Sequence, residues 1–467
     1  MRITQAAVLP PVPPQRAERM RLPVRLRRFA ELARSRVGRV ELLYAAFNKA
    51  WPLLSAVATV HRRWLGRRTK VVAVVGSFGK TTAARCVAAA LGLPERQPRD
   101  NCRSHLALAV LARTGWRGAT VLEVGIDHPG QMASYARVLR PDVAVVTSIG
   151  SEHGRSLGGR AATRREKAMM VRALPGCGLA VLNGDDPEVA AMRGDTSAAV
   201  VTFGTEPWCD VRASGITLDF PRGMRFRVEA GGEAAEVTVR LCGREMVYPV
   251  LAALAVARAA GVPLAEAAAR VANVAPAPGR LQRVALPVGA TLVRDEFKST
   301  LETVHAALDL LEAVPARRRI VVLGDVSEPE GSQGPIYRAL GARVAAIADY
   351  AVFLGRKTSA YRSGALRAGL PPGAVAAVGH DVALASRLVR ERLRPGDVVL
   401  VKGRDNERLD RISLALMGRD VRCTRPHCYF LKTRCEGCSL LSREDAAQRT
   451  RYAFPHREAI RAPAAPA

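Results

Sequence analysis

Val71-Val72-Ala73-Val74-Val75-Gly76-Ser77-Phe78-Gly79-Lys80-Thr81-Thr82 is the stretch of the sequence that decides the fold. Its first five residues are apolar, mostly β-branched, and predict a buried strand. The glycines that follow let the backbone curl so that successive N–H groups and the start of the next helix face a phosphate. Lys80 would neutralise the outer phosphates and the Thr81 hydroxyl would bind Mg²⁺. The stretch therefore predicts an ATP site, and the residues expected to hold the nucleotide are Gly76, Ser77, Gly79, Lys80, Thr81 and Thr82.

The chain is long and strongly basic. Its 467 residues leave room for two or three domains with cores of their own. Lys and Arg number 71 against 42 Asp and Glu, a formal charge of +29, which predicts an anionic partner such as nucleotide phosphates, an anionic substrate or a membrane surface. Aromatic residues make up only 5% of the chain and do not interleave with a basic stretch, so no specific nucleic acid is expected. The alternative is that the arginines lie on solvated faces without a partner.

Short apolar runs follow the loop at a spacing that favours parallel β-α-β units. Strands are expected at Val71–Val75, Thr120–Val124, Val143–Thr147, Leu179–Leu182 and Val200–Phe203. Residues 210–242 alternate apolar and polar side chains between glycines, which predicts antiparallel strands. A helix of small residues is expected at Ala252–Ala260.

Pro276-Ala277-Pro278-Gly279 is the clearest linker signal, and a second α/β series begins after it. Strands are expected there at Thr291–Arg294, Ile320–Leu323, Val352–Leu354 and Val398–Val401, with helices near 301–313 and 382–393. These signals divide the chain into a basic helical segment at 1–69, an ATP-binding domain at 70–279, a C-terminal domain at 280–420, a Cys-rich segment at 421–440 and a flexible tail at 441–467. The first nineteen residues are rich in Pro and Arg and are expected to be disordered.

The N-terminal segment has no signal-peptide pattern. Its longest apolar stretch, residues 42–60, is interrupted by Asn48, Lys49 and Pro52, whereas roughly 18 uninterrupted apolar residues would predict a spanning helix. Residues 20–65 are read either as helices that dock on the protein or as a basic amphipathic helix on a membrane or a partner. We therefore expect a cytoplasmic protein and leave association with a membrane surface open.

Four of the nine cysteines, Cys423, Cys428, Cys435 and Cys438, cluster near the end of the chain, with His427 between them. Two pairs of thiolates on short loops can complete a tetrahedral structural zinc site. Redox-active or unpaired thiols and an iron–sulfur cluster are the alternatives. The other five cysteines are scattered singly, as is typical of small buried side chains in a reducing compartment.

Several segments after the loop resemble, in sequence and in order, motifs of the Mur ligase family. They are Val121–Gly125, Pro141–Gly150 followed by His153, Glu166-Lys167, Ala180–Asp186, Gly279-Arg280-Leu281-Gln282, Val322–Asp325 and Asp397–Gly403. The resemblance covers roughly residues 70–417 and is closest to the branch that adds D-alanyl-D-alanine. It implies a central P-loop ATPase domain with a mostly parallel sheet and a Rossmann-like C-terminal α/β domain.

The resemblance also implies an activity and a set of residue roles. The expected reaction joins a carboxylate to an amine through an acyl phosphate made from ATP, releasing ADP and phosphate. Thr81 and Glu123 would hold one Mg²⁺, and His153 with a carbamylated Lys167 would hold a second metal near the substrate carboxylate. Arg280 would clamp the phosphates, and Asn183 and Asp295 would contact the nucleotide, Asp295 through the ribose hydroxyls. The plain alternative for each side chain is a capping residue, a solvated helical face or a surface ion pair.

The sequence departs from the family pattern in four places, the first being the Asn-rich turn before Glu123, which is reduced to Asn101-Cys102-Arg103-Ser104-His105. Gly243–Pro249 lacks the two asparagines with which the family reads adenine, and Phe297-Lys298-Ser299-Thr300-Leu301 stands in place of Tyr-Asn-Ala-Asn-Pro. The family's uridine-nucleotide-binding first domain has no counterpart, so a precursor with a uridine diphosphate handle is not the preferred substrate. Three alternatives remain at this stage: a nucleotide-binding regulatory or scaffold protein that ligates nothing, a polyamino-acid synthase at a membrane, and a nucleic-acid-dependent ATPase.

Overall fold

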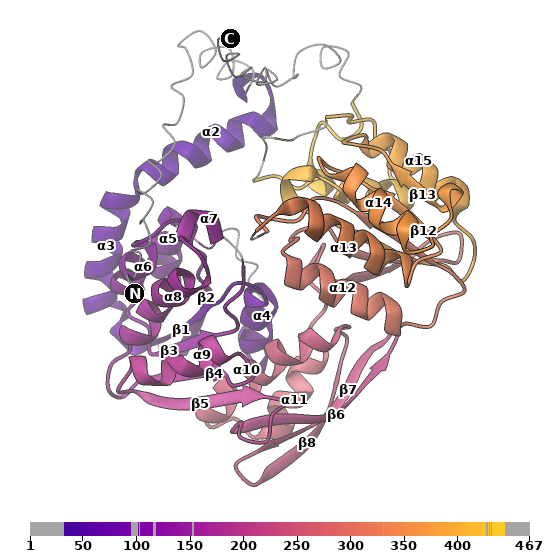
Figure 1. Cartoon of the computed structure of the whole chain (residues 1–467). Helices are drawn as coiled ribbons and strands as arrows, with labels where there is room; N and C mark the ends of the chain where they lie inside the picture. The colour runs from indigo at the N-terminus through magenta and orange to yellow at the C-terminus, as the bar shows by residue number, and fades with distance from the viewer. Residues whose placement is uncertain are drawn as a thin grey trace, which may run out of the picture.

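The computed structural model describes residues 32–94, 101, 103–114, 118–151, 154–329, 331–425, 428, 430 and 432–443. Two sheets organise these residues, and helices cover both faces of each sheet (Figure 1). The first sheet carries the loop at residues 76–82, and the second lies toward the C-terminus. Both are mostly parallel, in agreement with the prediction of a P-loop α/β domain followed by a Rossmann-like one.

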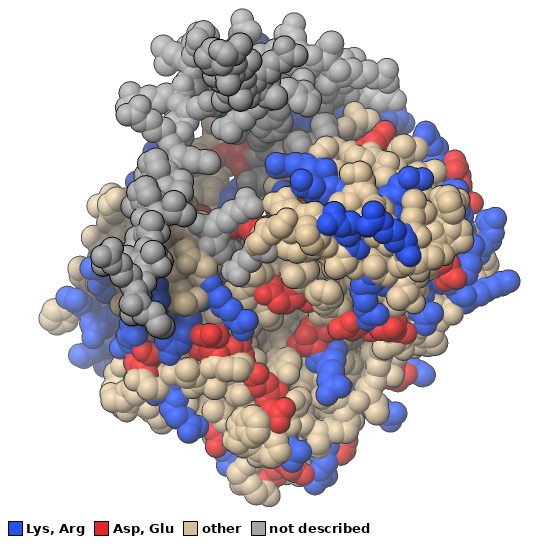
Figure 2. Space-filling model, in the orientation of Figure 1, with Lys and Arg blue, Asp and Glu red and all other residues tan. Residues whose placement is uncertain are grey.

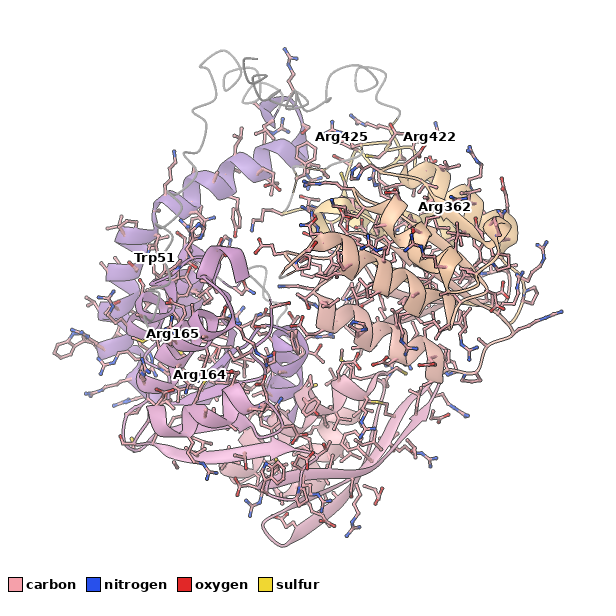
Figure 3. The ribbon with its side chains drawn as sticks, in the orientation of Figure 1. Trp51, Arg164, Arg165, Arg362, Arg422 and Arg425 are labelled. Carbon is pink, nitrogen blue, oxygen red and sulfur yellow. The ribbon has the colours of Figure 1, made fainter. Side chains whose placement is uncertain are left out.

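Two helices precede the first strand. They are α2 (Arg36–Lys49) and α3 (Trp51–Trp64), followed by the short turn η1 (Gly66–Arg68). The Trp51 ring, labelled in Figure 3, meets Tyr135 edge-on at 5.3 Å between ring centroids. No helix among the described residues is long and apolar enough to cross a membrane. α3 packs on the core of the first sheet through Trp51, Leu54 and Ala58, as the docking alternative predicted.

The first sheet has the strand order β2-β1-β3-β4-β5-β6-β7-β8. Its strands are β1 (Thr69–Val75), β2 (Gly118–Glu123), β3 (Val143–Val146), β4 (Leu179–Asn183), β5 (Ala199–Gly204), β6 (Val211–Asp219), β7 (Gly223–Ala230) and β8 (Glu233–Val239). The first six are parallel to their neighbours, and β6, β7 and β8 pair antiparallel. β7 alternates buried and exposed residues because only one of its faces meets the core. The predicted antiparallel excursion is confirmed.

Helices bury both faces of this sheet. One face is covered by α4 (Lys80–Ala90), α10 (Val247–Ala259) and α11 (Leu264–Ala272). The other is covered by α3, α5 (Arg103–Arg113), α6 (Gln131–Leu139) and α8 (Arg160–Arg172). The shorter helices are α7 (Gly154–Leu157), α9 (Pro187–Ala190), η2 (Ala191–Asp195) and η3 (Arg244–Met246). With both faces buried, the central strands can be apolar throughout, which explains the continuous runs in the sequence.

The second sheet has the order β13-β12-β11-β14-β10-β9 and is parallel except for β9. Its strands are β9 (Gln282–Ala285), β10 (Thr291–Asp295), β11 (Arg319–Leu323), β12 (Tyr350–Phe353), β13 (Val375–Ala377) and β14 (Val398–Lys402). Its helices are α12 (Leu301–Ala313), α13 (Gln333–Ala345), α14 (Thr358–Arg367), α15 (Val382–Arg392) and α16 (Asp410–Leu416), with short turns η4 (Pro372–Ala374), η5 (Asp405–Glu407) and η6 (Cys435–Gly437). The edge strands β9 and β13 were not predicted.

Polar contacts connect the two sheet-bearing parts. Ser151, beyond β3, donates from its backbone N–H and its hydroxyl to the two Glu302 oxygens on α12, each over 2.8 Å. Arg434, in the Cys-rich segment, donates to the Pro278 carbonyl over 2.6 Å. These contacts bring residues of the second half of the chain over the phosphate-binding loop.

Candidate active site

The phosphate-binding loop turns at two glycines. Gly76 leaves β1 with φ +146°, and a Cβ there would lie 2.0 Å from the Thr147 hydroxyl oxygen at the end of β3. Gly79 has φ +81° and caps α4, which begins at Lys80. Only glycine takes such angles at little cost, and only a residue without Cβ can approach β3 so closely. The loop therefore opens at the start of α4, where helix N–H groups attract anions.

Lys80 lies inside the loop. Its Nζ donates to the Gly76 carbonyl over 2.8 Å and to the Ser77 carbonyl over 3.0 Å. Burial lowers the Lys80 pKa to about 8, although Glu123 opposes that shift; Arg280 adds to it. The loop thus holds a lysine whose charge is costly until an anion arrives.

A cavity of about 230 Å³ opens over the loop. Its lining contains most of the predicted nucleotide and metal residues, namely Gly76, Ser77, Gly79, Lys80, Thr81, Glu123, Lys167 and Arg280. The lining also holds five cationic side chains, Lys80, Lys167, Arg280, Lys298 and Lys432, against the carboxylates of Glu123 and Asp127. An excess of positive charge in a recess favours a polyanion such as a nucleotide triphosphate.

Glu123 ends β2 next to the loop, where parallel neighbours place their carboxyl ends at one edge of the sheet. The Asn101 amide donates to Glu123 Oε1 over 2.8 Å and so orients the carboxylate. Thr81, on the first turn of α4, lines the same cavity. A carboxylate and a hydroxyl at one phosphate pocket are oxygen ligands of the kind that Mg²⁺ takes.

Lys167 reaches the loop from α8. Its Nζ donates to the Ser77 hydroxyl over 2.7 Å, and the side chain is only 4% exposed. Burial lowers the Lys167 pKa well below its usual range, Lys80 adds to this, and Asp186 opposes it. The structure thus brings an amine with a weakened hold on its proton to the phosphate loop.

Arg280 extends the site across the linker, with its guanidinium carbon 4.4 Å from the centroid of the Phe297 ring. Burial lowers the Arg280 pKa, against the attraction of Glu123 and Asp295. Lys298 follows Phe297, and burial lowers the Lys298 pKa to about 7, with Lys80 adding to the shift. Lys432, from the Cys-rich segment, completes this side of the cavity.

Three predicted nucleotide residues lie outside the lining of the cavity. Thr82 is buried within α4. The Asn183 amide donates to the Thr147 carbonyl over 2.9 Å, and its oxygen accepts from the Asp185 N–H. Asp295 is buried and accepts from Lys402 Nζ over 2.6 Å and from the Leu281 N–H over 3.2 Å. The roles assigned to them stay predictions, and His153 lies outside the described residues.

The four clustered cysteines are all described, and His427 is not. Arg411 contacts the Cys423 sulfur at 3.6 Å, the Leu440 N–H donates to the Cys438 sulfur over 3.4 Å, and burial raises the pKa of the Cys435 thiol. Among residues that the structure describes, no group of three His, Cys, Asp or Glu side chains is placed to hold a metal ion. The predicted zinc site therefore has no support from this arrangement.

Four polar side chains of the cavity had no role predicted from the sequence: Asn101, Asp127, Lys298 and Lys432. Lys298 was visible only as a departure from the family motif. Lys432 carried no signal, because it reaches the loop from a segment roughly 350 residues further along the chain. Only the folded chain brings it there.

A phosphate loop between a parallel strand and a helix, facing a cationic recess, defines a nucleotide-binding α/β enzyme. Family models agree with this class: the Mur ligase middle domain matches residues 74–257, and the Mur ligase glutamate ligase domain matches residues 279–404. The UDP-N-acetylmuramoyl-tripeptide–D-alanyl-D-alanine ligase of Mycobacterium bovis is 31% identical over 377 residues, 75% of this chain and 73% of that protein. The chain belongs to the Mur ligase family.

Solved structures agree on the fold. A crystal structure of MurF from Acinetobacter baumannii is 25% identical, with a TM-score of 0.70, covering 79% of this chain and 81% of that one. MurF ligase from Thermotoga maritima in complex with ADP is 21% identical, with a TM-score of 0.67, covering 79% and 83%. The chain is an ATP-dependent ligase that forms amide bonds between an acid and an amine, as the sequence predicted.

Proposed function

We propose that the cavity over residues 76–81 activates a peptide-like carboxylate as an acyl phosphate and passes it to an amine. A carboxylate oxygen attacks the γ-phosphorus of ATP and ADP leaves. The amine nitrogen then attacks the acyl carbon, phosphate leaves, and the nitrogen loses a proton. The observation that carries the proposal is the convergence of Lys80, Arg280 and Lys298 on one loop opposite Glu123, because phosphoryl transfer is mainly a matter of positioning and charge.

Magnesium fits this site. Mg²⁺ keeps several waters and takes one or two carboxylates together with substrate phosphates, so Glu123 and Thr81 suffice as protein ligands. The Asn101 bond to one Glu123 oxygen leaves the other oxygen of that carboxylate for the ion. The ion would supply neutralisation of the charge on the phosphates.

Lys167 is proposed to carry a carbamate. Carbamylation requires a neutral amine, and burial beside Lys80 favours that form of Lys167. The carbamate would place an anion next to Lys80, where a protonated Lys167 would be a second buried cation. Together with His153, the carbamate would offer oxygen and nitrogen ligands to a second metal near the donor carboxylate.

The name of a relative supports a proposal for the substrate class. The Mycobacterium bovis protein is named for joining D-alanyl-D-alanine to a UDP-N-acetylmuramoyl-tripeptide. For this chain we propose a donor that ends in a peptide carboxylate and an acceptor that is an amino acid or dipeptide.

The test is an assay of nucleotide products across amino acids, dipeptides and peptidoglycan fragments, with and without a uridine diphosphate carrier. ADP and phosphate that appear only with both substrates support the proposal. AMP would overturn the acyl phosphate. A product that lengthens with time would instead indicate a polyamino-acid synthase.

A further inference from the structure

Helix α3 exposes an apolar face. Leu53, Val57, Val60 and Trp64 follow one another at intervals of four, three and four residues, so they share one side of the helix. Their exposed fractions run from 49% to 72%. Of the ten large apolar side chains that the described residues expose, seven lie between residues 40 and 65. We call Leu53, Val57, Val60 and Trp64 the apolar stripe.

The opposite side of α3 holds the helix on the protein. Ala58 is fully buried and Arg62 is 5% exposed. Arg62 donates to Asp142 over 2.8 Å and to the Leu139 carbonyl over 2.9 Å, which fixes the helix against the start of β3. The apolar stripe is therefore presented outward by a helix whose orientation is set by buried bonds.

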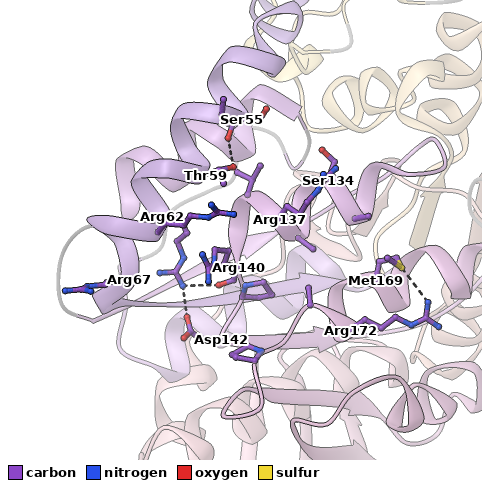
Figure 4. A pocket seen from close by; sticks show the side chains of 18 residues that line it. Ser55, Thr59, Arg62, Arg67, Ser134, Arg137, Arg140, Asp142, Met169 and Arg172 are labelled. Carbon is purple, nitrogen blue, oxygen red and sulfur yellow. Dashed lines mark hydrogen bonds and ion pairs between the residues drawn. The ribbon is translucent and has the colours of Figure 1, made fainter.

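An open groove of about 1110 Å³ borders the same helix (Figure 4). Its lining includes the exposed arginines Arg63, Arg67, Arg137, Arg140 and Arg172. Its carboxylate, Asp142, already accepts from Arg62 and lies 3.4 Å from Lys70 Nζ. We call Arg63, Arg67, Arg137, Arg140 and Arg172 the arginine groove. Figure 2 shows Lys and Arg gathered on the α3 side of the molecule, at the left.

Most of the arginine groove has no acidic partner. Arg172 pairs with Asp195, but the other four arginines make no ion pair with a carboxylate within the described part of the chain. The C-termini of α3, α6 and α8 meet at this edge, and arginines there offset the helix dipoles. An effect on helix dipoles does not explain the apolar stripe beside these arginines. Residues 51–68 contain no Asp or Glu, so α3 and the turn after it carry no negative side chain.

From these two neighbouring surfaces we infer that the chain docks on an anionic lipid bilayer through α3. The apolar stripe would enter the interface between headgroups and acyl chains, with the Trp64 ring at headgroup level. The arginine groove would take lipid phosphates, as basic clusters beside an amphipathic helix do. The arrangement adds an interfacial site that the ligase reaction does not require.

The location of the surface is compatible with turnover. The groove lies where β1 and β3 begin, since Asp142 accepts from the Val71 N–H. The ATP cavity lies where β1 ends, at Gly76, and a seven-residue strand spans roughly 23 Å. A bilayer against α3 would leave the cavity open to the solution.

The test is flotation of the full chain with vesicles of equal phosphatidylcholine and phosphatidylglycerol, and with phosphatidylcholine alone. We expect binding to the anionic vesicles only, with a blue shift of tryptophan emission. Leu53→Ser with Trp64→Ser should abolish binding, and Arg63→Gln with Arg67→Gln should weaken it by about fivefold for each arginine. Matched controls are Trp208→Ser, 68% exposed beyond β5, and Arg222→Gln with Arg225→Gln, in the turn between β6 and β7 and on β7.

Three outcomes would overturn the inference. One is failure of the wild-type chain to float with anionic vesicles. Another is floating that the stripe and groove variants leave unchanged. The third is a dimer that the stripe variant dissociates without any vesicle binding, which would mean that a second copy covers α3. Circular dichroism melting of each variant shows that it is folded, so loss of floating can be assigned to the surface.

Discussion

Lys167 of α8 donates to the Ser77 hydroxyl over 2.7 Å. This bond joins the phosphate-binding loop to a helix on the face of the first sheet opposite α4. The same hydroxyl donates to the Gly150 carbonyl and accepts from the Gly150 N–H. Ser77 thus connects the loop, the turn after β3 and the proposed carbamate site. A substitution at any one of these three places is expected to change the position of the other two.

The carbamate proposed on Lys167 would make activity depend on dissolved carbon dioxide. In buffer freed of carbon dioxide, turnover should fall and bicarbonate should restore it, because the neutral Lys167 amine forms the carbamate by adding carbon dioxide and losing a proton. Lys167→Arg should lose activity and not respond to bicarbonate, since a guanidinium does not form a carbamate. Lys70→Arg, at an exposed lysine, is the control. Turnover that is indifferent to bicarbonate would refute the carbamate.

Gly76→Ala is expected to disrupt the loop. A Cβ at Gly76 would lie 2.0 Å from the Thr147 hydroxyl oxygen, and the backbone has φ +146°. We expect a loss of about 1–3 kcal/mol in the free energy of unfolding and ATP binding at least roughly tenfold weaker. Gly176→Ala is the matched control, because nothing lies within 4 Å of its Cβ and its φ is not in the left-handed range. Equal effects of the two substitutions would contradict this account of the loop.

ATP binding should take up protons above neutral pH. Burial lowers the pKa of Lys80 to about 8 and of Lys298 to about 7, and in each case a charged neighbour modifies the shift. The phosphates of ATP raise both pKa values, so between pH 7 and 9 the complex holds protons that the free enzyme has lost. Affinity should fall as pH rises through this window, and uptake should vanish near pH 6, where both lysines are already charged.

Calorimetry in buffers of different ionisation enthalpy measures this uptake. Lys298→Met should remove the proton uptake that begins near pH 7 and leave the uptake that begins near pH 8. Proton release, or no exchange at any pH, would contradict the placement of the two lysines at the phosphates.

The contact between Ser151 and Glu302 is expected to hold the two sheet-bearing parts in register over the cavity. Glu302→Ala removes two hydrogen bonds to a charged oxygen pair, and we expect kcat/KM to fall by about tenfold. Glu391→Ala, exposed on α15, is the control. Small-angle scattering should show a larger radius for the Glu302 variant; unchanged scattering together with unchanged kcat/KM would rule out this role.

Much of the fold was predictable because its central strands are buried on both faces and therefore apolar without interruption. The edge strands β9 and β13 escaped prediction. β13 has three residues in an Ala-, Gly- and Pro-rich stretch, and β9 leaves most of its residues half-exposed, so neither carries a strong apolar signal. Their positions depend on the neighbouring strand rather than on their own sequence.

The site was predictable where it is local in sequence. Lys80 and Thr81 lie on the loop itself, and Glu123, whose role the family resemblance implied, ends the parallel strand paired with β1. Lys432 lies there because a distant segment folds back, a contact that no periodicity encodes. Asn183 and Asp295 show the converse, since their side chains bond to Thr147 and Lys402 rather than line the cavity.

The central claim is that this loop drives acyl phosphate formation. The most direct measurement is phosphate release with donor and acceptor present, comparing the wild-type chain with Lys80→Ala and identifying the nucleotide product. We predict ADP, dependence on both substrates, and a loss on the order of 10²–10³-fold in kcat for Lys80→Ala. Release of AMP, or phosphate release by Lys80→Ala at the wild-type rate, would contradict the account.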